Sequence, residues 1–344
     1  MTLSCLPTRS FRRGGRRSCG GLLVCLVSLL FLLPGIEVAA EEGVVEGTWM
    51  DALRQATDAM EWTDDRISHG WRIQRKPGDE ACRILDPRDA SVFAGTHAEC
   101  LDTFAELTDK GTIPEVRGPT VILLHGLGEG RGSMQPLAVH LRKSQNATVL
   151  SFGYASPRTG IDDHARSLGR VIDGLPHAHP ISFVGHSLGN IVVRRWMALA
   201  DERQRGRLNR MVMLGAPNQG SELARMASRV WVLAALSNGA ARELVVDWPT
   251  VAPTLAVPTC PFGIIAGGKG DDRGFSSLLE GDDDAIVKVT ETLLEGSSDF
   301  LLVPVRHSLM MKDPTVQRAT VSFLTQGHFL VPEQAPDKPA APAQ

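Results

Sequence analysis

The chain has 344 residues, of which 43% are hydrophobic and 22% are charged. This composition is that of a globular protein with enough length for a sizeable core, and it excludes a fibrous or wholly disordered protein. The formal net charge is −3 and residues 1–40 hold five Arg and one Glu, so the rest of the chain carries −7; an acidic balance of this kind argues against a nucleic-acid partner.

The first 40 residues have the pattern of a secretory signal peptide. Five arginines precede an apolar run over residues 22–33, and Val38-Ala39-Ala40 supplies the small residues typical of a cleavage site. The apolar run is too short for a comfortable transmembrane span. We therefore expect an exported protein, secreted or periplasmic, that is cut near Ala40. An uncleaved signal would instead leave the protein anchored to the membrane.

Residues 41–117 read as a small preface that contains a helix and a β-hairpin. Helical spacing covers residues 49–60 and returns at 98–107, and two short strands are predicted at 70–74 and 82–85. No motif in this segment carries chemistry.

Three cysteines remain after the signal. Cys82 and Cys100 lie in the preface, and Cys260 lies far away. In an oxidising compartment, Cys82 and Cys100 can pair as a disulfide while Cys260 stays buried and free. The odd count equally permits three free thiols.

From about residue 118 the pattern changes to strands that alternate with helices, which is typical of a parallel α/β sheet. Short apolar runs predict strands at residues 120–125, 147–152, 181–185, 210–214, 262–266 and 300–305. Helical patterns lie between them at residues 134–144, 161–175, 188–204, 221–236 and 315–325. The prediction for residues 118–331 is an α/β, doubly wound, mostly parallel sheet with helices on both faces. Residues 332–344, rich in Pro and Ala, predict a disordered tail.

The strand predicted at 181–185 ends in Gly185-His186-Ser187-Leu188-Gly189 and passes directly into a helical pattern. This order describes a strand, a sharp turn and a helix with the serine at the apex, where only glycines let strand and helix approach closely. The serine hydroxyl would stand at the positive end of a helix, which favours a developing oxyanion. The motif is short enough to occur by chance, so its surroundings must support it.

Candidates for an oxyanion hole and a base lie at other strand ends. The strand at 120–125 breaks into Gly126-Leu127-Gly128, so the backbone amide of Leu127 can join that of Leu188 as an oxyanion donor. His307 follows the last predicted strand, where this architecture needs its base. The side chain of His186 is expected to point away from the Ser187 hydroxyl.

The orienting acid is predicted within Asp282-Asp283-Asp284, which lies between the strand at 262–266 and His307. The chain order serine, aspartate, histidine is therefore satisfied. Asp284 is the first choice because it adjoins Ala285 and an apolar run, and Asp282 is the alternative acid. A solvated acidic turn or a cation-binding loop would account for the other carboxylates.

These segments resemble the lipase and esterase branch of the α/β-hydrolase superfamily over roughly residues 118–328. The matching stretches are LHGLG at 124–128, GHSLG at 185–189, LGAPNQGS at 214–221, GDDDAIV at 281–287 and VPVRHS at 303–308. The resemblance implies Ser187 as nucleophile, His307 as base and Asp284 as acid, with the amides of Leu127 and Leu188 as oxyanion donors. The branch more often has glycine where Ala285 stands.

The function predicted on this basis is a secreted serine carboxylic-ester hydrolase that works through a Ser-His-Asp triad and an acyl-enzyme. It needs an ester or lipid substrate, no metal and no organic cofactor. An acyltransferase or amidase would use the same triad, and a non-catalytic binding protein on a hydrolase scaffold is a further alternative. The apolar segment 220–261 predicts either a lid over an acyl pocket, with transient contact to a membrane or lipid surface, or a helix that covers the sheet.

Overall fold

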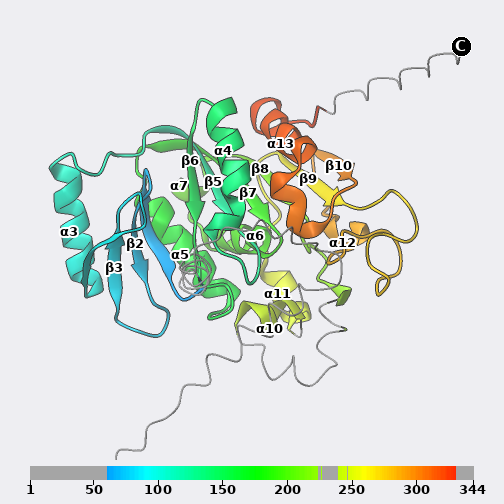
Figure 1. Cartoon of the computed structure of the whole chain (residues 1–344), viewed down its shortest axis with the longest axis horizontal. Helices are drawn as coiled ribbons and strands as arrows, with labels where there is room; N and C mark the ends of the chain where they lie inside the picture. Colours follow the sequence, from blue (N-terminus) through cyan, green and yellow to red (C-terminus); the bar gives the residue numbers. More distant parts are fainter. Residues whose placement is uncertain (1–59, 224–225, 227–238, 246, 331–344) are drawn as a thin grey trace, which may run out of the picture. The chain divides into compact units, whose positions relative to one another are not determined.

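The computed structural model describes residues 60–223, 226, 239–245 and 247–330, all of which belong to the second of two compact units, residues 46–344 (Figure 1). Outside the described residues lie the predicted signal peptide at 1–40, most of the helix predicted at 49–60, most of the segment 221–238 and the predicted tail at 332–344. These stay predictions. No helix in the described ranges is long and apolar enough to cross a membrane.

A parallel sheet forms the centre of the described structure. Its six strands are β5 (Gly118–Leu124), β6 (Thr148–Phe152), β7 (Ala178–His186), β8 (Leu208–Leu214), β9 (Phe262–Gly267) and β10 (Asp299–Val303). Their order across the sheet is β10-β9-β8-β7-β5-β6, with every neighbouring pair parallel. The sequence predicts each of these strands to within a few residues, because strands covered on both faces are continuous apolar runs.

Helices cover both faces of this sheet, as the fold-class prediction requires (Figure 1). One face meets α5 (Ile161–Asp173) and α6 (Leu188–Leu199), and the other meets α4 (Gln135–Ser144) and α13 (Pro314–Gln326). Successive side chains of a strand point to opposite faces, so β5 sends Ile122 and Leu124 to the α5–α6 side and Val121 and Leu123 to the α4–α13 side.

One predicted helix is divided in the structure. The pattern at residues 188–204 forms α6 and a separate short helix, α7 (Glu202–Arg205). Asp201 lies between them in an extended conformation, and its side chain accepts a hydrogen bond from the backbone N–H of Gln204. The residue therefore ends the apolar helix and caps the next one.

Residues 63–109 form a small antiparallel sheet with one helix. The sheet consists of β1 (Thr63–Ser68), β2 (Trp71–Arg75), β3 (Cys82–Leu85) and β4 (Ser91–Gly95), in that order, and α3 (His97–Asp109) packs on it. The predicted hairpin is the central β2–β3 pair. Sequence patterns miss β1, since the TDDRIS sequence carries adjacent aspartates that are rare in strands.

These aspartates can be buried because other parts of the chain supply hydrogen-bond donors to their carboxylates. Asp64 is fully buried and accepts hydrogen bonds from Arg72 Nη1 at 2.6 Å, Gln74 Nε2 at 2.8 Å and the backbone N–H of Gly153 at 2.7 Å. The backbone N–H of Asp64 donates in turn to the carbonyl of Gly153 at 2.9 Å. Asp64 therefore joins the small sheet to the carboxyl end of β6.

Of the two alternatives for the cysteines, a Cys82–Cys100 disulfide or three free thiols, the structure has the free thiols. Cys82, Cys100 and Cys260 are all free and buried. The thiols of Cys82 and Cys100 are hydrogen-bonded to each other between β3 and α3, and burial raises the pKa of both. The neighbouring pair is thus placed in the apolar core of the small sheet.

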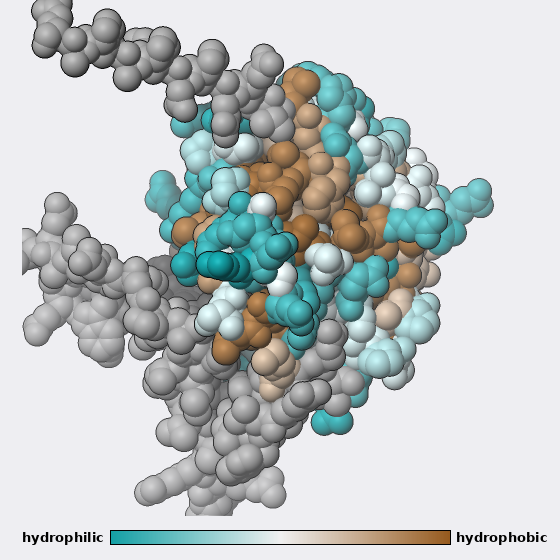
Figure 2. All heavy atoms as spheres, turned by 90° about the vertical axis from the view of Figure 1, so that its right-hand side faces the viewer, coloured by the Kyte–Doolittle hydropathy of each residue, from teal (hydrophilic) through white to brown (hydrophobic). Residues whose placement is uncertain are grey.

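The edge strand β10 carries apolar residues to the surface. Phe300 and Leu302 are 37% and 36% exposed and alternate with inward-facing positions. Figure 2 views the side of the molecule on which β10 lies and shows hydrophobic side chains among polar ones. Small apolar patches of this kind are ordinary on the surface of a folded domain.

Removal of the Asp64 carboxylate tests the joint between the two sheets. Asp64→Ala leaves the buried guanidinium of Arg72 without its counter-ion, so we expect the free energy of unfolding to fall by about 3–5 kcal/mol. Urea denaturation followed by circular dichroism measures this loss. Glu106→Ala is the control, because its ion pair with Lys110 is exposed and contributes about 0.5 kcal/mol or less. Equal losses in the two variants would contradict the assignment.

Candidate active site

Ser187 lies at the turn between β7 and α6. Its backbone has φ 51° and ψ −120°, a conformation that non-glycine residues rarely adopt. The turn is held from both sides, since the N–H of Ser187 donates to the carbonyl of Leu214 at 2.9 Å and its carbonyl accepts from the N–H of Asn190 at 3.1 Å. Strain of this kind persists only where the surrounding structure fixes it.

The two glycines of the motif are needed for close approach. A Cβ on Gly189 would lie 2.6 Å from the carbonyl oxygen of Leu124 and 2.9 Å from that of His125, which belong to the end of β5. A Cβ on Gly185 would collide with the side chain of Asn190. Any larger residue would therefore push α6 away from the sheet.

His307 and Asp284 form a buried pair. His307 begins the 3₁₀ helix η3 (His307–Lys312), and its Nδ1 donates to Asp284 Oδ2 at 2.6 Å, while its backbone N–H donates to the Asp284 carbonyl at 2.8 Å. The other oxygen, Asp284 Oδ1, accepts from the backbone amides of Ile286 and Val287. Burial disfavours the imidazolium, but the Asp284 carboxylate outweighs it, so the pKa of His307 is raised above its ordinary value.

The pair lies beside Ser187. A Cβ on Gly215 would be 2.9 Å from His307 Nδ1, and Gly215 directly follows Leu214, whose carbonyl holds the Ser187 amide. The ring of His186 lies 4.5 Å from that of His307. Nδ1 of His307 is committed to Asp284, so Nε2 is the nitrogen available to the serine. Within the described ranges the Ser187 hydroxyl forms no hydrogen bond, and such bonds often tighten only with substrate bound.

The three successive aspartates have different partners. Asp282 accepts from the backbone amides of Lys269 at 2.7 Å and Gly270 at 2.8 Å, so the alternative acid is turned away from the imidazole. Asp283 accepts from the amides of Ser276 and Ala285. Among the three, Asp284 is the one that contacts His307.

The described residues also bear on the cation-binding alternative. Within the part of the chain that the structure describes, no group of three or more His, Cys, Asp or Glu side chains is arranged to hold a metal ion. The acidic run serves instead to fold the loop after β9 around its own carboxylates.

The predicted oxyanion turn lies over the serine. A Cβ on Gly126 would be 3.2 Å from Ser187 Cβ, so the turn from Gly126 to Gly128 passes directly beside the candidate nucleophile. The backbone amides of Leu127 and Leu188 have no acceptor among the described residues, whereas that of Gly128 donates to Ser156 Oγ at 3.0 Å. Two amide donors are therefore available at the place where negative charge would develop.

The sequence did not single out Glu129, which holds this turn. Glu129 Oε2 accepts from the backbone N–H of Gly126 at 3.0 Å and from Ser133 Oγ at 2.8 Å, and it lies 3.3 Å from His186 Nδ1. Burial alone would raise the pKa of Glu129, but His186 and the two hydrogen bonds hold it well below its usual range. The only sequence signal is a glutamate three residues after Gly126.

The histidines near the serine are structural by their contacts. His186 is buried, and its Nε2 lies 3.1 Å from the carbonyl oxygen of His307. His125 stacks on Tyr154 with ring centroids 4.2 Å apart, and Tyr154 Oη donates to the His125 carbonyl at 2.5 Å. These contacts fix the end of β5, from which the oxyanion turn departs.

The described part of the predicted lid packs against the body of the domain. It consists of α10 (Ala240–Val245), α11 (Trp248–Val251) and a short 3₁₀ segment. Glu243 Oε2 accepts from the backbone N–H of Ile161 at the start of α5, and Trp248 is buried in the core on the α5–α6 side. Residues 224–225 and 227–238 lie outside the described residues, so the lid stays a prediction.

The family comparison agrees with this architecture. Residues 119–237 match the family model described as alpha/beta hydrolase fold. The six-stranded parallel sheet covered by helices on both faces, with a strand–serine–helix turn after β7, is the α/β-hydrolase fold that this family model describes. No curated protein matches it by sequence.

Solved structures are similar to this chain at low sequence identity. The lipase BlEst2 from Bacillus licheniformis in its propeptide form has a TM-score of 0.50 and 16% identity, over 64% of this chain and 54% of that one. Its mature form has a TM-score of 0.48 and 16% identity, over 63% and 94%. Phospholipase PlaB from Legionella pneumophila has a TM-score of 0.41 and 20% identity, over 51% and 45%. At these identities the likeness concerns the fold.

The close approach at Gly189 can be tested by one methyl group. Gly189→Ala forces α6 away from β5, so we expect a loss of about 1–3 kcal/mol in the free energy of unfolding, together with slower reaction of Ser187. Thermal unfolding and labelling by a fluorophosphonate measure the two effects. Gly132→Ala is the matched control, because a Cβ there meets nothing within 4 Å. A Gly189→Ala variant as stable and as reactive as this control would overturn the argument.

Proposed function

We propose that this protein is a serine hydrolase that cleaves carboxylic esters. The observation that carries the proposal is the buried His307–Asp284 pair, with Nδ1 and Oδ2 2.6 Å apart, beside a serine held at positive φ on a strand-to-helix turn. This combination supplies a partly buried serine hydroxyl, a base and the group that orients the base.

The mechanism assigns one task to each group. His307 Nε2 takes the proton of Ser187 as the hydroxyl attacks the acyl carbon, and Asp284 holds the ring and stabilises the imidazolium that forms. The amides of Leu127 and Leu188 bind the oxyanion. His307 then gives the proton to the departing alcohol, and a water molecule activated by the same imidazole releases the acid from the acyl-enzyme.

Ester cleavage is favoured among the reactions that share this triad by the resemblance to lipases and esterases, for the fold itself hosts many chemistries. The substrate class proposed is an ester or a lipid. A binding protein that has lost its chemistry would typically lack one of the three side chains, and all three are present. We further propose that the protein acts outside the cytoplasm, on the strength of the signal-like residues 1–40.

Labelling of the purified protein by a fluorophosphonate tests the nucleophile. We expect wild type to be labelled once and Ser187→Ala not at all, because the reagent needs an activated serine. Ser144→Ala is the control, since this serine is exposed at the end of α4. Absence of labelling in folded wild type would refute the proposal.

Ester turnover separates the two candidate acids. Asp284→Asn should reduce kcat by about 10⁴-fold, as loss of the orienting carboxylate does in serine triads. Asp282→Asn should affect kcat far less, since Asp282 binds the amides of Lys269 and Gly270 instead. If Asp282→Asn were the more damaging change, the acid would be assigned wrongly.

The pH profile of kcat/KM tests the base. His307 must be neutral to accept a proton, so activity should rise with pH through a midpoint above the ordinary histidine pKa of about 6.5, in line with its raised pKa. In Asp284→Asn the carboxylate that raises the pKa is lost while burial remains, so the midpoint of the residual activity should move to lower pH. Asp282→Asn should leave the midpoint in place. An unmoved midpoint in Asp284→Asn would contradict the pairing.

A further inference from the structure

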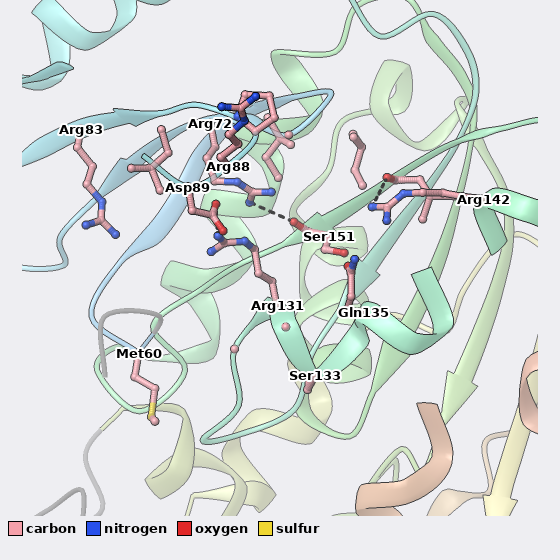
Figure 3. Close-up of a pocket in the computed structure, with 18 of the residues that line it drawn as sticks. Met60, Arg72, Arg83, Arg88, Asp89, Arg131, Ser133, Gln135, Arg142 and Ser151 are labelled. Carbon is pink, nitrogen blue, oxygen red and sulfur yellow. Dashed lines mark hydrogen bonds and ion pairs between the residues drawn. The ribbon is translucent and has the colours of Figure 1, made fainter. Parts of the chain in front are cut away.

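A large cavity lies between the small sheet and the segment that follows the oxyanion turn. Its volume is about 800 Å³, and its walls come from β2, β3, the loop after β3, the 3₁₀ helix η1 (Arg131–Met134), α4 and β6 (Figure 3). A volume of this size is that of a site for a small organic molecule. The candidate catalytic residues Ser187, Asp284 and His307 do not line it.

The walls of this cavity are rich in arginine. Its guanidinium groups belong to Arg72, Arg83, Arg88, Arg131 and Arg142, and Asp89 supplies the one carboxylate among the described lining residues. In Figure 3 the side chains of Arg72 and Arg131 approach one another from opposite walls, near Ser151 and Asp89. Such a concentration of one charge on concave walls attracts anions.

Local ion pairs neutralise only part of this charge. Asp64 binds Arg72 at 2.6 Å, and Asp89 forms an ion pair with Arg131. Neither Arg88 nor Arg142 has a carboxylate partner in the described ranges, and the hydrogen bond of Arg142 runs to the carbonyl of Val149 at 3.4 Å. The lining therefore keeps an excess of positive charge.

Two buried donors on the walls have no partner. Arg72 and Ser151 are only 6% and 8% exposed, yet Arg72 Nε and Ser151 Oγ form no hydrogen bond among the described residues. The same two residues are already linked, because Arg72 Nη1 lies 3.3 Å from the carbonyl oxygen of Ser151. A buried donor without an acceptor is costly and rare in native proteins. Two of them on facing walls of one arginine-lined cavity indicate an acceptor-rich ligand.

The protonation balance of Arg72 points the same way. Burial lowers the pKa of its guanidinium, and the neighbouring charge of Arg131 adds to this effect, while the carboxylates of Asp64 and Asp89 oppose it. An anion bound near Arg72 and Arg131 would offset the cost of the buried charge and the repulsion between the two guanidinium groups.

We propose that this cavity binds a phosphate group carried by a small organic molecule, with Arg72 Nε and Ser151 Oγ as its buried donors and Arg88 and Arg131 as its charged partners. A phosphate offers several acceptor oxygens in different directions, which suits donors from two walls, and arginine is the side chain best matched to it. The site does not depend on the esterase proposal, since binding is measured without turnover.

The cavity is in direct contact with the end of the predicted oxyanion turn. Gly128 and Ser133 line the cavity, and Ser133 Oγ donates to the Glu129 carboxylate that holds the amide of Gly126. A bound phosphate compound would thus rest against the segment that presents the Leu127 amide, so binding there should also slow proteolysis of the turn.

Isothermal titration of the purified protein tests the proposal with three probes. Inorganic phosphate reports the bare anion, glycerol 3-phosphate reports a small phosphomonoester, and vesicles of phosphatidic acid against phosphatidylcholine report a lipid headgroup. We expect saturable binding of glycerol 3-phosphate that is tighter than that of inorganic phosphate. Binding only to phosphatidic acid vesicles would overturn the assignment to a small molecule, and binding of none would overturn the site.

Variants locate the binding in the cavity. Ser151→Ala and Arg88→Gln should each weaken glycerol 3-phosphate about tenfold, while Ser151→Ala should leave the unliganded Tm unchanged or higher, because it removes an unpartnered buried hydroxyl. Arg203→Gln is the charge-matched control, because this side chain is exposed on α7 and does not line the cavity. Equal binding by wild type, Ser151→Ala and Arg88→Gln would refute the site, and a fall in the unliganded Tm of Ser151→Ala would indicate a merely structural role.

Discussion

The left-handed backbone of Ser187 is the constraint on which the rest of the site depends. A non-glycine residue at φ 51° is strained by on the order of 1–3 kcal/mol. The surrounding sheet offsets this strain, because β7 lies between β5 and β8 and is hydrogen-bonded to both. The Leu214 carbonyl holds the serine amide from β8, and the closely packed end of β5 lies against Gly189. The turn can be strained because the sheet around it is rigid.

Two carboxylate–histidine pairs meet around this turn. Asp284 binds His307 on the side of β8 and β9, and Glu129 lies against His186 on the side of β5. The two imidazole rings lie 4.5 Å apart, and His186 Nε2 contacts the carbonyl of His307. The candidate base and the candidate oxyanion turn are therefore positioned through one shared contact, so a change in Glu129 should be felt at both. Neither half of the site is built by a single loop.

Sequence patterns predict the parts of this molecule that depend on local order. The apolar runs of β5 to β10 give the sheet, and the chain order of Ser187, Asp284 and His307 gives the candidates for the site. Patterns fail where burial depends on distant partners. β1 was missed because Asp64 is acceptable inside only with Arg72 and Gly153, the latter 89 residues away. The cavity could not be predicted from the sequence, because Arg72 and Ser151 are 79 residues apart in the chain. No local spacing of residues indicates that they are in contact.

In the loop that carries Asp284, the hydrogen bonds that hold a strained backbone also orient the candidate catalytic carboxylate. Ala285 has φ 86°, a conformation that favours glycine. Alanine is tolerated because Asp283 Oδ1 accepts its amide at 2.6 Å and Asp284 Oδ1 accepts the next two amides. Those bonds turn the chain sharply after Asp284, and they leave Oδ2 as the oxygen that faces the imidazole. The departure from glycine at Ala285 therefore adds local strain without displacing the carboxylate.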